Sequence, residues 1–515
     1  MKYRLLISLQ IICLLICFSL PAQKQTLHPN ILFIPVDDLR PELGCYGNGL
    51  IKTPNIDRLA RNGMVFTRAY CQQAVCNPSR ASLLTGLRPD TLQVWDLQTP
   101  FRGNLPDAVT LPQYFKNNGY QTIGIGKAFH NIFPDSLSWS EALHVDGFPF
   151  DPDAVYTDEP NLSIIAEKKK KFIDRKDTSR IDQYGQWYIK ANAMEKADVP
   201  DDAYYDGAQT TRAIQKLTQL KERKQPFFLS IGFYKPHLPF NAPTKYWNLY
   251  SEKDLPVATN PYIPYLAPEF AISGGDAELR GYDDQHDLPT PLQTPLSKEK
   301  QQQLVHGYYA SISYIDAQIG RLLDELDKLG LTQNTIVVLW GDHGWKLGEH
   351  NGWCKQTNYE IDTRVPLIVS GFGVQAKNKQ TAALVELVDI YPSLCAMAGL
   401  QTPGYLQGRS FAPLTSNPAL AWKQAAFSQF LMGHFPKKES GKNDRMGYSM
   451  RTDGYRYVEW YTWQNNKKGQ LIARELYDEK KDPQENRNVV LESGYQKMVP
   501  LLTKQLSEGW RKTVK

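Results

Sequence analysis

Residues 31–38 read Ile-Leu-Phe-Ile-Pro-Val-Asp-Asp, an apolar run that ends in two acids. Such a run, followed directly by polar residues, is typical of a strand that is buried in a parallel sheet. Similar strands alternate with amphipathic helical runs along the chain, which indicates an α/β fold. We expect further strands at 120–125, 226–233, 335–340 and 365–369, and helices at 54–64, 211–224, 298–329 and 386–398.

The sequence changes in texture after about residue 420. Residues 448–460 are typical of a β-hairpin that turns at Asp453-Gly454. We therefore predict a large domain over residues 23–420 and a smaller C-terminal domain over residues 421–515. Two stretches of the large domain, 135–200 and 241–295, are rich in Pro, Asp and Tyr, and we predict that they are long loops that shape a binding site.

Composition excludes several classes of protein. The chain has 515 residues, of which 42% are hydrophobic and 22% charged, so it is globular rather than disordered, with two to four structural units as a prior expectation. The net charge of +5 is too small for a dedicated nucleic-acid binder, but it allows a polyanionic substrate. The run Lys168–Lys171 is either a contact for such a polyanion or a solvated charged face.

The first 22 residues have the pattern of a secretory signal. Lys2 and Arg4 precede the apolar run 5–20, and small or polar residues follow at 21–23. An uncleaved anchor and a lipidated Cys17 are the alternatives, although Ile16 stands where a lipoprotein signal has a small residue. We predict export to the periplasm, with secretion or a lysosome-like compartment as the alternatives. We predict no stable membrane insertion after the signal is removed.

Few cysteines remain in the predicted mature chain. There are five, an odd number and too few for a disulfide scaffold: Cys45, Cys71, Cys76, Cys354 and Cys395. In an exported protein, at least one of them is therefore unpaired, paired between chains or chemically modified.

Acidic residues follow two of the predicted strands at their carboxyl ends, where open α/β sheets bind ligands. Asp37 and Asp38 would repel one another unless a cation lies between them, and their hard oxygen ligands suit calcium or magnesium. Taken alone, such a pair is more often part of a turn or a cap. Asp342 and His343 follow the strand at 335–340, so the two pairs together can form one oxygen-rich metal site with a nitrogen ligand.

Basic residues and a cysteine complete the set of polar clusters. Pro78 suits a first helical turn, which places Cys76 at a helix N-terminus, with Arg80 close enough to bind an anion there. A buried, unreactive thiol is the plain alternative. Further candidates lie after the strands at 120–125 and 226–233 and in the loop after residue 350: Lys127, His130, Lys235, His237 and Lys355.

The string Cys76-Asn77-Pro78-Ser79-Arg80, with Thr85-Gly86 after it, resembles the signature of the sulfatases. In that family the cysteine is oxidised to formylglycine. The resemblance covers nearly the whole predicted mature chain and is strongest to the iduronate-2-sulfatase group, because His343 stands where many sulfatases carry Asn. Lys346 departs from the small residue expected there. The resemblance therefore covers the catalytic core but does not identify the substrate pocket. Further supporting strings are 37–41, 73–76, 235–237, 341–345, 347–350 and 446–449.

The resemblance implies an alkaline-phosphatase-like sandwich, with a large mixed sheet flanked by helices and a smaller C-terminal α+β domain that has an antiparallel sheet. It implies one Ca²⁺, bound by Asp37, Asp38, Cys76, Asp342 and His343. Lys127, Lys355 and Arg80 would neutralise the sulfate oxygens. His237 would donate a proton to the leaving sugar hydroxyl, and His130 would accept one when sulfate is released.

The resemblance also implies partners and a substrate. The partners are a formylglycine-generating maturation enzyme and a sulfated oligosaccharide, whose 2-O-sulfate on a hexuronic acid would be removed. Trp345, Lys346 and Trp353 either line the sugar subsite, or the two tryptophans pack in the interior while Lys346 is solvated. Two other functions remain open. One is a hydrolase of the same fold that acts on phosphate esters or on an algal galactan or ulvan. The other is a catalytically silent glycan-binding protein with an unmodified Cys76.

Overall fold

The computed structural model describes residues 28–130, 133–141, 155–181, 187–223, 225–272, 277–433 and 444–512. The predicted signal, residues 1–22, lies outside the described residues, as does Cys17. In the described part of the chain, no helix has both the length and the apolar content that a membrane crossing needs.

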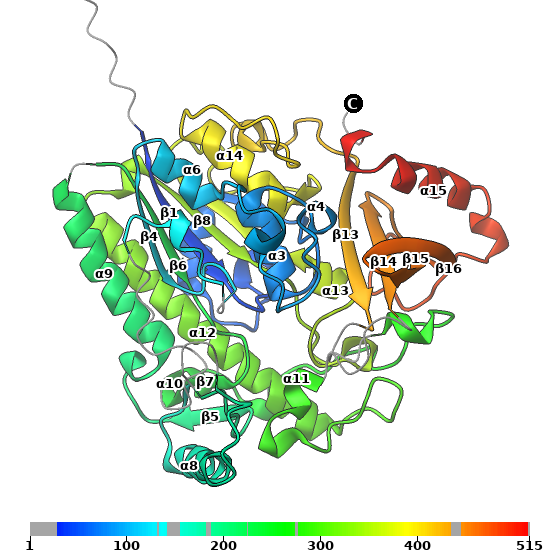
Figure 1. The fold of residues 1–515 in the computed structure, drawn as a ribbon, viewed down its shortest axis with the longest axis horizontal. Helices are drawn as coiled ribbons and strands as arrows, with labels where there is room; N and C mark the ends of the chain where they lie inside the picture. Colours follow the sequence, from blue (N-terminus) through cyan, green and yellow to red (C-terminus); the bar gives the residue numbers. More distant parts are fainter. Residues whose placement is uncertain are drawn as a thin grey trace, which may run out of the picture.

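A seven-stranded mixed sheet forms the centre of the molecule, in the order β11-β2-β10-β8-β1-β6-β4 (Figure 1). Strands β8, β1, β6 and β4 are parallel, whereas β10 runs antiparallel to β8. Four neighbouring strands therefore end at the same edge. The strands are β1 (Asn30–Val36), β2 (Gly63–Phe66), β4 (Gln121–Gly126), β6 (Phe227–Gly232), β8 (Thr335–Gly341), β10 (Leu367–Gly371) and β11 (Lys379–Thr381).

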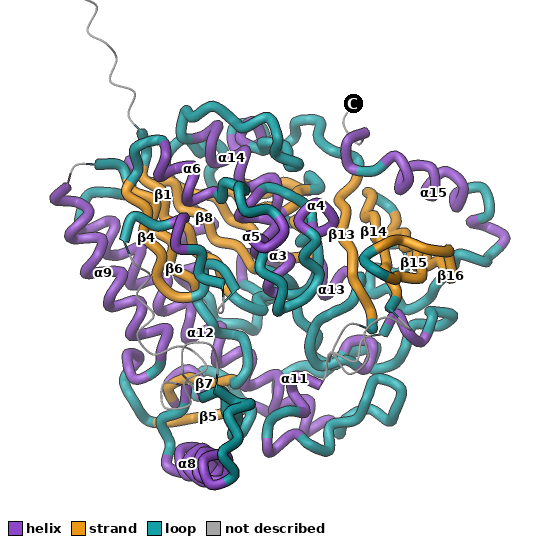
Figure 2. Tube along the Cα trace, viewed as in Figure 1, coloured by secondary structure: helices purple, strands orange, loops and turns teal. Residues whose placement is uncertain are grey.

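Helices cover both faces of this sheet, and alternate side chains of β1 show why (Figures 1 and 2). Leu32 and Ile34 join a core with α9 (Tyr205–Arg223) and α12 (Lys298–Lys328). Ile31 and Phe33 point to the other face, where they join α3 (Cys76–Thr85), α6 (Leu111–Asn117) and α14 (Ile390–Met397). The predicted buried strand and the α/β class are confirmed.

The C-terminal part contains a four-stranded antiparallel sheet, β13 (Ala425–Met432), β14 (Arg445–Thr452), β15 (Tyr455–Gln464) and β16 (Lys467–Asp478). Strands β14 and β15 form the predicted hairpin around Asp453-Gly454. Helix α15 (Met498–Glu508) covers this sheet, with Leu502 packed against Tyr457 and Leu476.

Local structure differs from the sequence-based expectation in three places. The predicted helix 54–64 ends early, as α2 (Pro54–Arg61), because β2 begins at Gly63. The predicted helix 386–398 is a 3-10 turn followed by α14. The predicted loop 135–200 contains α8 (Glu159–Asp174), capped by Asp158, and β5 (Met194–Ala197). Helix α8 buries Ile165 in a small local core, and its lysine run conceals that apolar side in the sequence.

A buried charge network joins the C-terminal sheet to the helix α13 (Glu360–Thr363). Arg456 lies 2.5 Å from both Glu360 and Glu485, and Arg451 lies 3.1 Å from Glu360 and 3.2 Å from Glu479. Three carboxylates thus face two guanidinium groups. Burial and the charges of Glu485 and Glu360 raise the pKa of Glu479 to about 9. One of the three carboxyl groups therefore keeps its proton at neutral pH.

This network predicts that Glu479→Gln stabilises the protein more as pH rises. The pKa of Glu479 is raised on folding, so its contribution to stability is fully present below pH 4.5 and is lost as pH rises through about 9. A glutamine has no such proton to lose, so the variant keeps this contribution at high pH. Its free energy of unfolding, relative to that of the wild type, therefore rises by up to about 1.4 kcal/mol per pH unit between pH 4.5 and about 9. Urea unfolding at pH 5, 7 and 9 measures it. Glu508→Gln, on the exposed side of α15, is the control, and a pH-independent difference for Glu479→Gln would contradict the prediction.

Candidate active site

The polar clusters that the sequence places after separate strands lie together at one edge of the sheet. In the β1–β8 register Val36 stands opposite Gly341, so Asp37 and Asp342 leave the sheet side by side. Strand β4 ends before Lys127, and the chain after β6 leads to His237. Because these four strands are parallel neighbours, their carboxyl ends bring the side chains to one place.

Asp38 has an unusual backbone conformation that aims its side chain into the site. Its φ is 58°, in the left-handed region that non-glycine residues rarely occupy. Its N–H donates to Asp342 Oδ1 at 3.0 Å, and its carbonyl accepts from Tyr308 of α12 at 2.7 Å. Two hydrogen bonds from different elements thus hold this strained turn in place.

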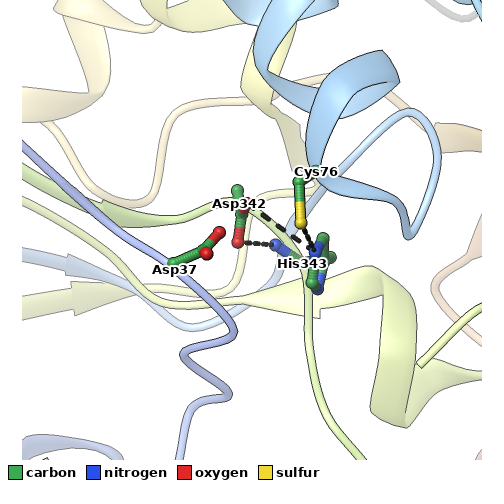
Figure 3. Close-up of side chains that lie close together, drawn as sticks. All are labelled: Asp37, Cys76, Asp342 and His343. Atoms are coloured by element: carbon green, nitrogen blue, oxygen red, sulfur yellow. Dashed lines mark hydrogen bonds and ion pairs between the residues drawn. The ribbon is translucent and has the colours of Figure 1, made fainter. Parts of the chain in front are cut away.

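Cys76 is the first residue of α3, as predicted. Val75 before it is extended, Pro78 lies in the first turn, and Gly86 ends the helix with φ of 68°. The Cys76 side chain points from α3 toward the ends of β1 and β8 (Figure 3). Its Sγ lies 3.2 Å from His343 Nε2. Burial and the charge of Asp37 raise the pKa of this thiol well above its ordinary value, against the opposing charges of two lysines.

Arg80 lies one helical turn after Cys76 and has no exposed side-chain surface. Its Nη2 lies 3.0 Å from Asp37 Oδ1, and its Nε lies 2.9 Å from Asp342 Oδ2. Its Nη1 donates to the carbonyl groups of Lys127 and Ala128. One guanidinium therefore connects α3 with the ends of β1, β8 and β4.

Two buried lysines flank the same carboxylates. Lys127 pairs with Asp37, and Lys355 Nζ lies 2.7 Å from Asp38 Oδ1 and 3.7 Å from Cys76 Sγ. Burial lowers the pKa of Lys127, but the negative charge of Asp37 acts in the opposite direction, and the pKa is raised overall. The pKa of Lys355 is likewise raised, by Asp38 first. Both ammonium groups are thus charged, and that of Lys355 is adjacent to Cys76.

The two predicted histidines differ in environment. His237 Nε2 lies 2.9 Å from Glu278 Oε1, and its Nδ1 lies 2.6 Å from the carbonyl of Leu238. His130 has a buried Nδ1 without a hydrogen-bond partner among the residues that the structure describes. Burial and the charge of Lys127 hold the pKa of His130 well below its ordinary value, so its imidazole is neutral at neutral pH.

The arrangement offers two overlapping sets of metal ligands within 4.8 Å of one another. Asp38 Oδ2 is buried and has no hydrogen-bond partner in the described part of the chain, as expected of an oxygen that ligates a cation. Carboxylate oxygens suit a hard cation, so the donor set fits a divalent metal such as calcium or magnesium. The two sets are Asp37, Cys76, Asp342 and His343, and Asp37, Asp38 and His237.

Comparison with known families decides the assignment. Residues 29–400 match the family described as Sulfatase. The chain belongs to the sulfatase family. Residues 348–512 of this sulfatase also match a second family, described as N-sulphoglucosamine sulphohydrolase, C-terminal. The sequence-based assignment to the sulfatases, made from the signature around Cys76, is confirmed.

The sequences of two relatives align with most of this sulfatase. It is 34% identical to iduronate 2-sulfatase of Mus musculus, over 90% of this chain and 91% of the relative. It is 33% identical to iduronate 2-sulfatase of Homo sapiens, over 94% of each chain. A solved structure of a protein in complex with its substrate D-glucosamine-2-N,6-O-disulfate superimposes with a TM-score of 0.70 at 24% identity, covering 94% of this chain and 98% of that one. This last likeness confirms the predicted fold.

Glu278 is a component of the site that the sequence analysis missed. It belongs to the short helix α11 (Ala277–Arg280), and its carboxylate lies 2.9 Å from His237 and 3.3 Å from Lys355. Burial opposes its ionisation, but the charges of Lys355 and His237 hold its pKa well below the ordinary value. Residues 241–295 show no periodicity that would single out this glutamate, so no sequence signal was available for it.

Of the two alternatives for Trp345, Lys346 and Trp353, the structure supports interior packing of the tryptophans, but Lys346 is buried rather than solvated. All three side chains are buried, with exposures of 0%, 3% and 2%. Lys346 forms an ion pair with Asp362, and Trp345 packs against Tyr308 and lies under Lys355, whose Nζ is 5.2 Å from the ring centre. These residues pack in the interior behind the site, and Trp345 supports Lys355 through a cation–π contact.

The contacts of Arg80 predict a large loss of stability in Arg80→Met. Removing the guanidinium leaves Asp37 and Asp342 without it in a buried site, which costs about 3–5 kcal/mol. Arg58→Met, which breaks a partly exposed ion pair with Asp324, is the control and costs about 0–1 kcal/mol. Urea unfolding measures both variants. Arg80→Lys, which keeps the charge, should lie between wild type and Arg80→Met, and a loss below about 1 kcal/mol for Arg80→Met would contradict the prediction.

Proposed function

We propose that this sulfatase removes the 2-O-sulfate of a hexuronic acid from glycosaminoglycan oligosaccharides. The observation that carries the proposal is the likeness to iduronate 2-sulfatases over at least nine-tenths of this chain and of each relative. The site geometry supports it, because buried cations surround Cys76 and can neutralise an oxyanion.

The family implies that Cys76 is converted to formylglycine, whose hydrate supplies the nucleophile. Lys127 and Lys355 are placed to neutralise the sulfate oxygens, and Arg80 adds its charge from behind the carboxylates. His237 is the proton donor to the leaving sugar oxygen. His130, kept neutral by burial and by Lys127, accepts a proton when sulfate is released.

We propose calcium as the metal, held by Asp37, Asp38, Asp342 and His343 together with the converted Cys76. The unpartnered Oδ2 of Asp38 and the clustering of the carboxylates support a hard divalent cation. When bound, calcium supplies positive charge that lowers the pKa of a coordinated hydroxyl group.

We also propose that a formylglycine-generating enzyme acts on Cys76 before export to the periplasm. The support is the signal-like pattern of residues 1–22, with Lys2 and Arg4 ahead of an apolar run. A smaller domain over residues 421–515 that completes the substrate pocket remains part of the proposal.

Substrate choice tests the proposed function. Matured enzyme should hydrolyse a disaccharide with a 2-O-sulfated uronic acid faster than a 6-O-sulfated glucosamine or an aryl phosphate. Cys76→Ala should reduce turnover to less than about a thousandth while leaving the fold intact. Cys71→Ala, which removes another buried thiol five residues earlier, is the matched control and should keep activity. Preference for the phosphate or for the 6-O-sulfate would refute the proposal.

Peptide mass spectrometry separates a wrong substrate from failed maturation. The tryptic peptide from Ala69 to Arg80 contains both Cys71 and Cys76. After alkylation, Cys71 should carry the label, and Cys76 should instead show a loss of about 18 Da, the difference between thiol and aldehyde. An inactive protein with the aldehyde in place would count against the proposed substrate.

Metal binding predicts a thermal shift. Adding calcium to protein treated with a chelator should stabilise it by about 2.7 kcal/mol at 100 times the dissociation constant, because the ion binds the folded state. Asp38→Asn should remove most of this shift, and Asp107→Asn, at an exposed turn, should not. Calorimetry with calcium and with magnesium measures it. An unchanged shift in Asp38→Asn would exclude the proposed site, and a larger shift with magnesium would overturn the choice of calcium.

A further inference from the structure

A strongly basic cavity lies beside α8, outside the candidate active site. Its volume is about 590 Å³, and none of the described residues that line it is acidic. Five of them are cationic, and the aromatic rings of Phe172 and Tyr188 complete the wall. The five cations are Lys168, Lys171, Arg175, Arg180 and Lys190. The whole chain has a net charge of only +5, so this is a local concentration of positive charge.

Two of these lysines hold the cavity in shape. Lys168 pairs with Asp283 and donates to the carbonyl of Lys190 at 2.6 Å. Lys190 Nζ donates to the carbonyl of Glu278 at 3.0 Å and lies 4.3 Å from the ring centre of Tyr282. The wall of the cavity is therefore anchored to the segment that contains α11.

The other three cations are available to a ligand. Lys171 pairs only with Glu167 on the same helix face, where both side chains are at least 60% exposed, so water screens the pair. Within the described part of the chain, neither Arg175 nor Arg180 forms an ion pair. Asp177 is close enough for both arginines to lower its pKa, after the larger effect of Ser179, but it does not line the cavity.

Helix α11 connects this cavity to the candidate active site. The backbone carbonyl of Glu278 accepts from Lys190 on the cavity side, and the carboxylate of the same residue contacts His237 and Lys355. Lys355 in turn lies 3.7 Å from Cys76 Sγ. Both α8 and α11 lie in the lower part of Figure 1. A chain of sugars with one sulfate at Cys76 would have to pass α11 to reach the cavity.

We propose that this cavity is a second subsite, which binds sulfate and carboxylate groups on sugars beyond the one that is desulfated. The inference rests on the proposed function, and it adds that the preferred substrate is longer than a disaccharide. The cations Lys171 and Arg175 at the end of α8 and Arg180 beyond it suit anions spaced along a glycan, and the partly buried rings of Phe172 and Tyr188 add apolar surface to the wall.

Binding of size-defined heparin oligosaccharides tests the subsite. The full chain carrying Cys76→Ala, which does not consume the ligand, is titrated with a labelled hexasaccharide and with a disaccharide. We expect the added change Lys171→Ala/Arg175→Ala to weaken hexasaccharide binding about tenfold and to flatten its salt dependence, because two charges that release counterions are lost. Binding of the disaccharide should not change.

The matched control is Lys169→Ala/Lys170→Ala, which removes two charges from the same helix but outside the cavity. An equal loss in the control, or no loss in Lys171→Ala/Arg175→Ala, would overturn the proposal. In the background with Cys76 intact, disaccharide turnover should be the same with and without the cavity substitutions. Absence of 2-O-desulfation would refute the proposed function alone, because the binding measurement does not depend on turnover.

Discussion

The guanidinium of Arg80 is the contact on which the site depends. It is fully buried, and it donates to Asp37 after β1, to Asp342 after β8 and to the two carbonyl groups after β4. Burying carboxylates is costly unless they are paired and hydrogen bonded, and this arrangement satisfies the requirement for both. Because Arg80 follows Cys76 by four residues on α3, the contact that holds the strand ends also fixes the position of the thiol.

Around this centre, supporting residues fix the direction of each functional group. Tyr308 of α12 holds the left-handed turn at Asp38, and Trp345 lies under the ammonium group of Lys355. Asp206 of α9 accepts hydrogen bonds from the backbone N–H groups of Tyr234 and Lys235, which fixes the loop that presents His237. The two helical layers therefore do more than bury the sheet, because residues from α9 and α12 reach its carboxyl edge.

Sequence reasoning found the strand ends because the strands are continuous apolar runs that stop at polar residues. Asp37 and Asp342 could therefore be placed at one edge before any contact was known. It failed where position along the chain does not give side-chain direction: Trp345 lies between two functional motifs but points into the interior. Glu278 could not be found, since its meeting with His237 and Lys355 is a tertiary contact from an irregular segment. The roles of the site residues stay predictions.

The surroundings of His237 connect this proposed proton donor to α11. One ring nitrogen faces the carbonyl of Leu238 and the other faces the carboxylate of Glu278, and both of these groups only accept hydrogen bonds. Under the proposed function, a leaving sugar oxygen takes the Nε2 proton in place of Glu278, and a sulfate near Lys355 competes with the same carboxylate. The proposed chemistry therefore couples the position of α11 to the occupancy of the site.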